Sequence, residues 1–181
     1  LAALPDQRGR SVTITLTADQ SAALERTKHW ASHEASQVLT LGGYAGTGKT
    51  TLVRTLLDGE MAGSRVLAPT GKACQVLGHK GVEAKTIHAF LYFPPEEDAR
   101  TAELKWTTRG IKGSGFLIVD EASMISLPVY NQLIATGFRI LFVGDHGQLP
   151  PVGEDPGIMR NPHIRLEQIV RQAAESPVLR F

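Results

Sequence analysis

The stretch that most constrains the fold is residues 43–50, which fill every fixed position of the pattern G-x-x-x-x-G-K-[ST]. The apolar run 37–41 before it predicts a buried strand, and the run 51–57 after it predicts a helix. Glycines in such a loop let backbone N–H groups turn around phosphates at a helix N-terminus. A chance glycine-rich turn, the alternative, does not account for the flanking strand and helix. We therefore expect a nucleoside triphosphate site.

Each position of this loop has an expected role. Lys49 is expected to reach the β- and γ-phosphates, and Thr50 is expected to place its hydroxyl on Mg²⁺. The residues expected to contact the nucleotide are Gly43, Ala45, Gly46, Thr47, Gly48, Lys49, Thr50 and Thr51.

Composition sets looser bounds. A length of 181 residues suits one domain with a small appendage. The net charge of +1 does not by itself indicate a nucleic-acid partner. The single cysteine, Cys74, excludes a disulfide framework within the chain and suits a reducing cytoplasm, which is the location we expect. No apolar run is long enough for a membrane span, so we expect no membrane partner.

The chain as a whole has an α/β pattern. Thr17 and Gln20 form a capping-box pattern for a helix that runs to about residue 31. Four apolar runs follow at 38–41, 65–68, 116–119 and 139–143, and each leads into a polar or glycine-rich turn. Continuous apolar runs are typical of parallel strands that are covered on both faces. We expect a parallel sheet with helices on both faces, and a small insertion at residues 92–114 in which 103–108 forms one arm of a hairpin.

A carboxylate pair follows the third of these apolar runs. Asp120, at the expected carboxyl end of the strand, is expected to hold the Mg²⁺ that Thr50 also contacts. Glu121 is then positioned to polarise an attacking water. A helix N-cap is the alternative role for Asp120. Together the two carboxylates favour hydrolysis of the nucleotide over binding alone.

A polar loop follows the fourth run. The amide of Gln148 can donate to a γ-phosphate oxygen and accept from water, so it is a candidate sensor of the phosphate. A polar loop without function is the alternative. His146 is interpreted as a bystander, because no cysteine or second histidine lies at metal-ligand spacing.

These motifs together resemble the first RecA-like domain of superfamily 1 DNA helicases, closest to the RecD/Dda branch. The matching segments span nearly the whole chain in the family's order. They are 16–20 (Q-motif), 43–50 (P-loop), 67–73 (motif Ia), 86–88 (motif Ib), 120–124 (motif II), 144–151 (motif III) and 166–172 (motif IV).

The resemblance implies an α/β RecA-like P-loop fold, hydrolysis of ATP with Mg²⁺, and 5′-to-3′ movement on single-stranded DNA. It implies that Gln20 reads the adenine edge. The residues implied along the DNA are Pro69, Thr70, Thr86, His88 and Phe90. For Thr70 and Thr86 the alternative is helix capping, and for Phe90 it is a place in the core. The insertion would correspond to the family's small 1B element, with Trp106 either at the tip of a strand-separating pin or packed on the domain.

The resemblance also implies two RecA-like domains with ATP between them, and Arg171 as the arginine that stabilises charge on the transferring phosphate. We expect residues 1–91 and 115–165 to form the first domain, and 166–181 to begin the second, which would make the chain a fragment or a truncated homologue. A second RecA-like domain, in the same or another chain, is then an expected partner. One alternative is a module that binds ATP and single-stranded DNA with little turnover. The other is a small kinase, which is less favoured because no basic lid-like segment follows the P-loop.

Overall fold

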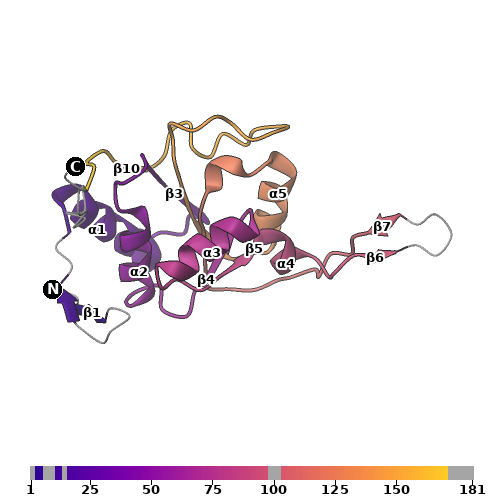
Figure 1. Cartoon of the computed structure of the whole chain (residues 1–181), viewed down its shortest axis with the longest axis horizontal. Helices are drawn as coiled ribbons and strands as arrows, with labels where there is room; N and C mark the ends of the chain where they lie inside the picture. Colours follow the sequence, from indigo (N-terminus) through magenta and orange to yellow (C-terminus); the bar gives the residue numbers. More distant parts are fainter. Residues whose placement is uncertain (1–2, 6–10, 14–15, 98–102, 171–181) are drawn as a thin grey trace, which may run out of the picture.

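A six-stranded parallel sheet forms the centre of the molecule (Figure 1). The computed structural model describes residues 3–5, 11–13, 16–97 and 103–170. The spatial order of the strands is β10-β3-β9-β8-β4-β5, and every neighbouring pair is parallel. The strands are β3 (Val38–Gly43), β4 (Arg65–Ala68), β5 (Ala84–Thr86), β8 (Phe116–Val119), β9 (Arg139–Gly144) and β10 (Ile164–Leu166). The parallel sheet expected from the four apolar runs is confirmed, with β5 and β10 added at its two edges.

Helices cover both faces of this sheet. In β9, Leu141 and Val143 belong to one buried cluster, whereas Ile140 and Phe142 belong to another. Because successive side chains of a strand point to opposite faces, the two clusters are the two sides of the sheet. The helices are α1 (Ala18–His33), α2 (Lys49–Leu57), α3 (Gly71–His79), α4 (Ile87–Leu91), α5 (Leu127–Ala135) and the short 3-10 helix η1 (Ala122–Met124).

Each face has its own set of helices. The first cluster contains Trp30 of α1, Leu52 of α2 and Leu77 of α3. The second contains Leu91 of α4 and Leu133 of α5. The helices on both faces expected from the sequence are therefore confirmed, and α1 begins with the predicted capping box between Thr17 and Gln20.

Two small antiparallel pairs lie outside the sheet. One joins β1 (Ala3–Pro5) to β2 (Ser11–Thr13), and the other joins β6 (Glu96–Glu97) to β7 (Leu104–Lys105). The β6–β7 hairpin projects away from the rest of the molecule (Figure 1). It lies within the insertion expected at 92–114, and its second strand lies within the hairpin arm expected at 103–108.

The expected boundary between residues 165 and 166 is wrong. Leu166 is fully buried and pairs with Gly43, so it is the last residue of β10 and an integral part of the sheet. A boundary there would cut through a paired strand. The described chain continues beyond β10 to residue 170.

Candidate nucleotide site at the carboxyl edge of the sheet

The three motifs expected to bind and hydrolyse the nucleotide meet at one edge of the sheet. The P-loop follows β3, Asp120 follows β8, and the loop that carries Gln148 follows β9. Since β9 pairs with both β3 and β8, and all three strands run in the same direction, their carboxyl ends are adjacent. Ligands of open α/β sheets bind at this edge.

The P-loop has the backbone shape that phosphate binding requires. Gly46 and Gly48 have φ values of 81° and 84°, a left-handed conformation that glycine adopts at little cost. Thr47 is buried, and its hydroxyl donates to the carbonyl of Tyr44 at 2.9 Å. Lys49 is the first residue of α2, so the expected phosphate-binding residues from Gly43 to Thr51 all lie on this strand, loop and helix N-terminus.

The Lys49 side chain folds over the loop. Its ammonium donates to the carbonyl oxygens of Gly43 at 2.5 Å and Tyr44 at 2.9 Å. Burial lowers the pKa of Lys49, and the negative charges of nearby carboxylates oppose this change. Those carboxylates belong to Asp145, Asp120 and Glu121. The charge of Lys49 therefore interacts with carboxylates that follow β8 and β9.

The carboxylate pair lies in a strained and partly desolvated turn. Burial raises the pKa of Asp120, which follows β8 directly and whose backbone N–H donates to Leu67 at 2.9 Å. Glu121 has φ 53° and ψ 39°, and it is the only non-glycine residue with a positive φ among the described residues. A left-handed conformation costs a non-glycine residue roughly 1–3 kcal/mol and is concentrated at functional sites.

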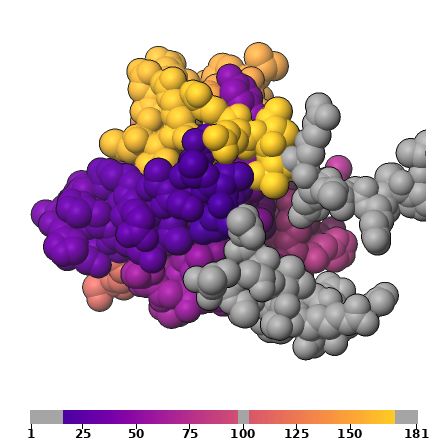
Figure 2. Space-filling view, turned by 90° about the vertical axis from the view of Figure 1, so that its left-hand side faces the viewer, coloured from indigo at the N-terminus to yellow at the C-terminus, as the bar shows by residue number. Residues whose placement is uncertain are grey.

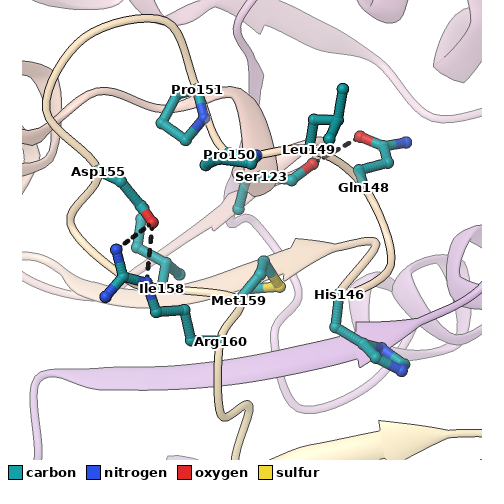
Figure 3. Close-up of a pocket in the computed structure, with 11 residues that line it drawn as sticks. Ser123, His146, Gln148, Leu149, Pro150, Pro151, Asp155, Ile158, Met159 and Arg160 are labelled. Carbon is teal, nitrogen blue, oxygen red and sulfur yellow. Dashed lines mark hydrogen bonds and ion pairs between the residues drawn. The ribbon is translucent and has the colours of Figure 1, made fainter.

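The loops after β8 and β9 are joined by a side-chain hydrogen bond (Figure 3). The hydroxyl of Ser123 donates to Oε1 of Gln148 at 2.7 Å. This bond uses one of the two lone pairs of the Gln148 amide oxygen and does not involve its N–H donors. In the same loop the backbone N–H of Gly147 donates to Asp145, and the ring of His146 lies 4.4 Å from that of Tyr44. Ser123 is a positioning group that the sequence did not reveal.

A second lysine also reaches this edge. Lys80, which follows α3, has its ammonium 3.5 Å from the hydroxyl of Thr50. Its positive charge acts on both Lys49 and Asp120. No sequence motif identified Lys80, because its approach to Thr50 depends on how α3 packs beside α2.

The structure supports some of the residues predicted to lie along the DNA and not others. Thr70 and Thr86 cap α3 and α4, accepting hydrogen bonds from the backbones of Ala73 and Ala89, each at 3.1 Å. The capping alternative is therefore confirmed for both, and their contact with DNA stays a prediction. Pro69 and His88 line a groove of about 430 Å³ whose other walls are mainly apolar. Those walls include Ile87, Met124, Val129, Leu149 and Pro151.

The prediction that Phe90 contacts DNA is wrong. It is only 7% exposed, and its ring packs edge-on against Phe138 with Arg65 above both rings. A ring enclosed in this way cannot stack on a base, so Phe90 belongs to the core.

Gln20 is bonded within the protein, and its expected contact with the adenine edge stays a prediction. Its side chain is 4% exposed, and its amide is bonded at one end to the backbone of Thr17 and at the other to the carbonyl of Thr47. Its side chain therefore contacts the P-loop directly. Arg171 lies outside the described residues, and its expected role stays a prediction.

A parallel sheet with a P-loop, an acidic pair and a polar loop at one edge defines a P-loop NTPase. Residues 15–179 match a family model described as "AAA domain", and the chain belongs to this family. Its relatives identify it further as a RecD/Dda-like motor domain of superfamily 1 helicases, which confirms the resemblance and the RecA-like fold expected from the sequence.

Three known proteins illustrate the relationship. The ATP-dependent RecD2 DNA helicase of Deinococcus radiodurans is 37% identical over 156 residues, which cover 79% of this chain and 21% of that protein. The ATP-dependent DNA helicase dda of Enterobacteria phage T4 is 32% identical over 135 residues, covering 68% and 30%. A Bacteroides Pif1 helicase, solved with ADP-AlF3 and ssDNA, has a TM-score of 0.58 at 21% identity, covering 90% and 44%. The chain thus spans less than a third of the length of the two curated relatives.

Among the described residues, no helix combines the length and the apolar character needed to span a bilayer.

Proposed function

We propose that this chain is a motor domain that hydrolyses ATP with Mg²⁺ and couples this reaction to single-stranded DNA, with 5′-to-3′ polarity. The observation that carries the proposal is the meeting of the P-loop, the Asp120–Glu121 turn and the Gln148 loop at the carboxyl edge of one sheet. The polarity rests on membership of the RecD/Dda branch alone.

ATP and Mg²⁺ fit the residues at this edge. The left-handed glycines 46 and 48 and the N-terminus of α2 supply backbone N–H groups and a partial positive charge for phosphates. The hydroxyl of Thr50 and the carboxylate of Asp120 are oxygen ligands of the kind that Mg²⁺ prefers. When bound, the metal ion neutralises charge that develops on the β- and γ-phosphates.

Water activation falls to the residues after β8 and β9. Glu121, held in its left-handed turn, is the general base that orients and deprotonates the attacking water. Gln148, whose amide oxygen accepts a hydrogen bond from Ser123, uses its N–H donors toward the γ-phosphate and so reports whether the phosphate is still attached. Arg171 and a second RecA-like domain would complete the site from the other side, as the family resemblance implies.

Single-stranded DNA is proposed to cross the surface formed by α3, α4 and the root of the β6–β7 hairpin. Exposed Thr70 and His88 are suited to contact phosphates and bases. The ring of His88 also lies 5.8 Å from that of Tyr92 and 6.1 Å from that of Trp106. Aromatic rings of this kind stack on bases without regard to sequence. The solved Pif1 complex with ssDNA supports the same class of ligand for this chain.

Tryptophan fluorescence tests the DNA part of this proposal. The chain has two tryptophans: Trp30 is fully buried, and Trp106 is 51% exposed beside His88. We expect saturable quenching when single-stranded DNA is added, because a base that stacks on Trp106 changes the environment of its ring. The control is Trp106→Phe, which leaves only Trp30 and should lose the response while still binding DNA. An unchanged wild-type signal at DNA concentrations that saturate the anisotropy of a labelled oligonucleotide would contradict the assignment.

A further inference from the structure

Two aromatic rings join the P-loop to the loop that follows β9. The ring of Tyr44 lies 4.4 Å from that of His146, and the angle between the two ring planes is 52°. Tyr44 occupies a variable position of the P-loop pattern, and the sequence alone assigns no role to His146. The structure therefore connects two residues of the site that no motif identifies.

Glycines on both sides make this contact close. A Cβ on Gly147 would lie 2.7 Å from Cε1 of Tyr44, so the tyrosine ring rests against the backbone next to His146. A Cβ on Gly42 would lie 3.0 Å from Nδ1 of His146, so the histidine ring rests against the strand that leads into the P-loop. Each ring is thus packed against the backbone from which the other ring extends.

His146 contributes the surface of its ring to this contact. Its Nδ1 atom is buried and has no hydrogen-bond partner among the described residues. In Figure 3 the ring points away from the side chain of Gln148, so the two residues extend from different sides of the loop. Aromatic rings at this separation attract one another beyond the area that they bury. A phenylalanine at position 146 would therefore keep the contact, whereas an alanine would remove it.

Other parts of the chain hold the rest of the P-loop. The carbonyl of Gly46 accepts a hydrogen bond from the backbone N–H of Val170 at 2.9 Å, and the carbonyl of Thr47 accepts one from Gln20 at 3.0 Å. In Figure 2 the residues near the end of the described chain, in yellow, lie directly against those of α1, in indigo. The ring of Tyr44 makes a different connection, because it leads from the P-loop to the loop after β9.

Gln148 therefore lies in a loop with two attachments. Its Oε1 accepts a hydrogen bond from Ser123 at 2.7 Å, which attaches it to the turn after β8. Two residues earlier in the same loop, His146 is packed against Tyr44 of the P-loop. Small displacements of a positioned group have large effects on the interactions that it makes. The two attachments together would fix the Gln148 amide relative to phosphates that the P-loop binds.

We propose that Tyr44 and His146 are positioning residues, which hold Gln148 where it meets the γ-phosphate. The inference rests on the proposed binding of ATP and on the proposed contact between Gln148 and the γ-phosphate. Its consequence is specific: loss of either ring weakens the binding of a nucleoside triphosphate and leaves the binding of the diphosphate unchanged. A contact that only stabilised the fold would not distinguish the two nucleotides.

The experiment measures the dissociation constants of Mg·ADP and of Mg·AMP-PNP, an ATP analogue that resists hydrolysis, by calorimetry. We expect His146→Ala to lower the preference for AMP-PNP over ADP about threefold to tenfold, the range of one aromatic contact, with ADP affinity unchanged. Tyr44→Ala should cause the same loss, and it also serves if His146→Ala does not fold, because Tyr44 is 48% exposed. The matched control is His146→Phe, which should keep the wild-type preference because its ring restores the contact.

A double substitution tests whether the rings act through Gln148. Gln148→Ala should also lower the preference for AMP-PNP over ADP. Adding His146→Ala to Gln148→Ala should cause no further loss, because the group that His146 positions is already absent.

Three results would overturn the inference. These are an unchanged preference or an equal loss of both affinities in folded His146→Ala, a loss in His146→Phe as large as in His146→Ala, or a full further loss when His146→Ala is added to Gln148→Ala. Failure of the proposed function is a different result, namely wild-type protein that binds neither Mg·ADP nor Mg·AMP-PNP.

Discussion

Replacing Lys49 by alanine should weaken ATP binding about a hundredfold or more. The ammonium of Lys49 lies over the P-loop, and its positive charge opposes the negative charges of Asp120, Glu121 and Asp145. Removing this ammonium deletes the charge-assisted hydrogen bonds that the lysine of a P-loop makes to the β- and γ-phosphates. Equilibrium binding of Mg·ATP, measured by calorimetry, checks the prediction.

Lys80 provides the matched control for Lys49. It is also a lysine near Thr50, but its side chain is exposed and its ammonium is 3.5 Å from the hydroxyl. Salt screens exposed charges, so Lys80→Ala should have a much smaller effect, which fades as ionic strength rises. Unchanged ATP affinity in a folded Lys49→Ala variant would remove the basis of the P-loop assignment.

Replacing Glu121 by glutamine should reduce ATP hydrolysis about a hundredfold or more while leaving ATP affinity nearly unchanged. The amide is of similar size but cannot take a proton from water, and general-base groups contribute on this scale. Single-turnover hydrolysis and calorimetric binding, measured on the same preparation, separate the two effects.

An exposed glutamate gives the control for this second substitution. Glu83, between α3 and β5, has the same carboxylate but lies outside the proposed site, so Glu83→Gln should hydrolyse ATP at the wild-type rate. If Glu121→Gln loses binding and hydrolysis in equal measure, the role of Glu121 is to maintain its turn and not to activate water.

The sequence predicted the centre of the sheet better than its edges. Strands β3, β4, β8 and β9 are almost continuously apolar because both faces of a central parallel strand are buried. The edge strands β5 and β10 have three residues each, with exposed Lys85 and Arg165 at their centres. Such short strands have no distinctive pattern, so the sequence did not predict β10, and the boundary expected from the motif IV resemblance falls inside it.

The site was predicted where residue types and spacing define the chemistry, and missed where packing does. The P-loop and the Asp120–Glu121 pair are recognisable because their roles need those residues in that order. The ring of Phe90 suits a base or a core equally well, and only its contacts with Phe138 and Arg65 assign it to the core. The bonds from Gln20 to Thr47 and from Ser123 to Gln148 join residues 27 and 25 positions apart, and no local pattern encodes them.

These long-range bonds suggest how the parts of the site act together. Ser123 fixes the Gln148 loop to the turn that carries Glu121, and Gln20 fixes the P-loop to α1. The loops after β8 and β9 are therefore directly connected at the proposed γ-phosphate site. The groove lined by Pro69 and His88 also includes Met124 of η1 and Pro150 of the Gln148 loop, so the same loops border the proposed DNA surface.

The most direct test of a DNA-coupled ATPase is the rate of ATP hydrolysis by this chain with and without single-stranded DNA, with Glu121→Gln as the blank. We predict hydrolysis above the blank that rises when single-stranded DNA is added, because the loops that would sense the γ-phosphate also border the DNA surface. A wild-type rate equal to that of Glu121→Gln at saturating ATP and DNA would contradict the account.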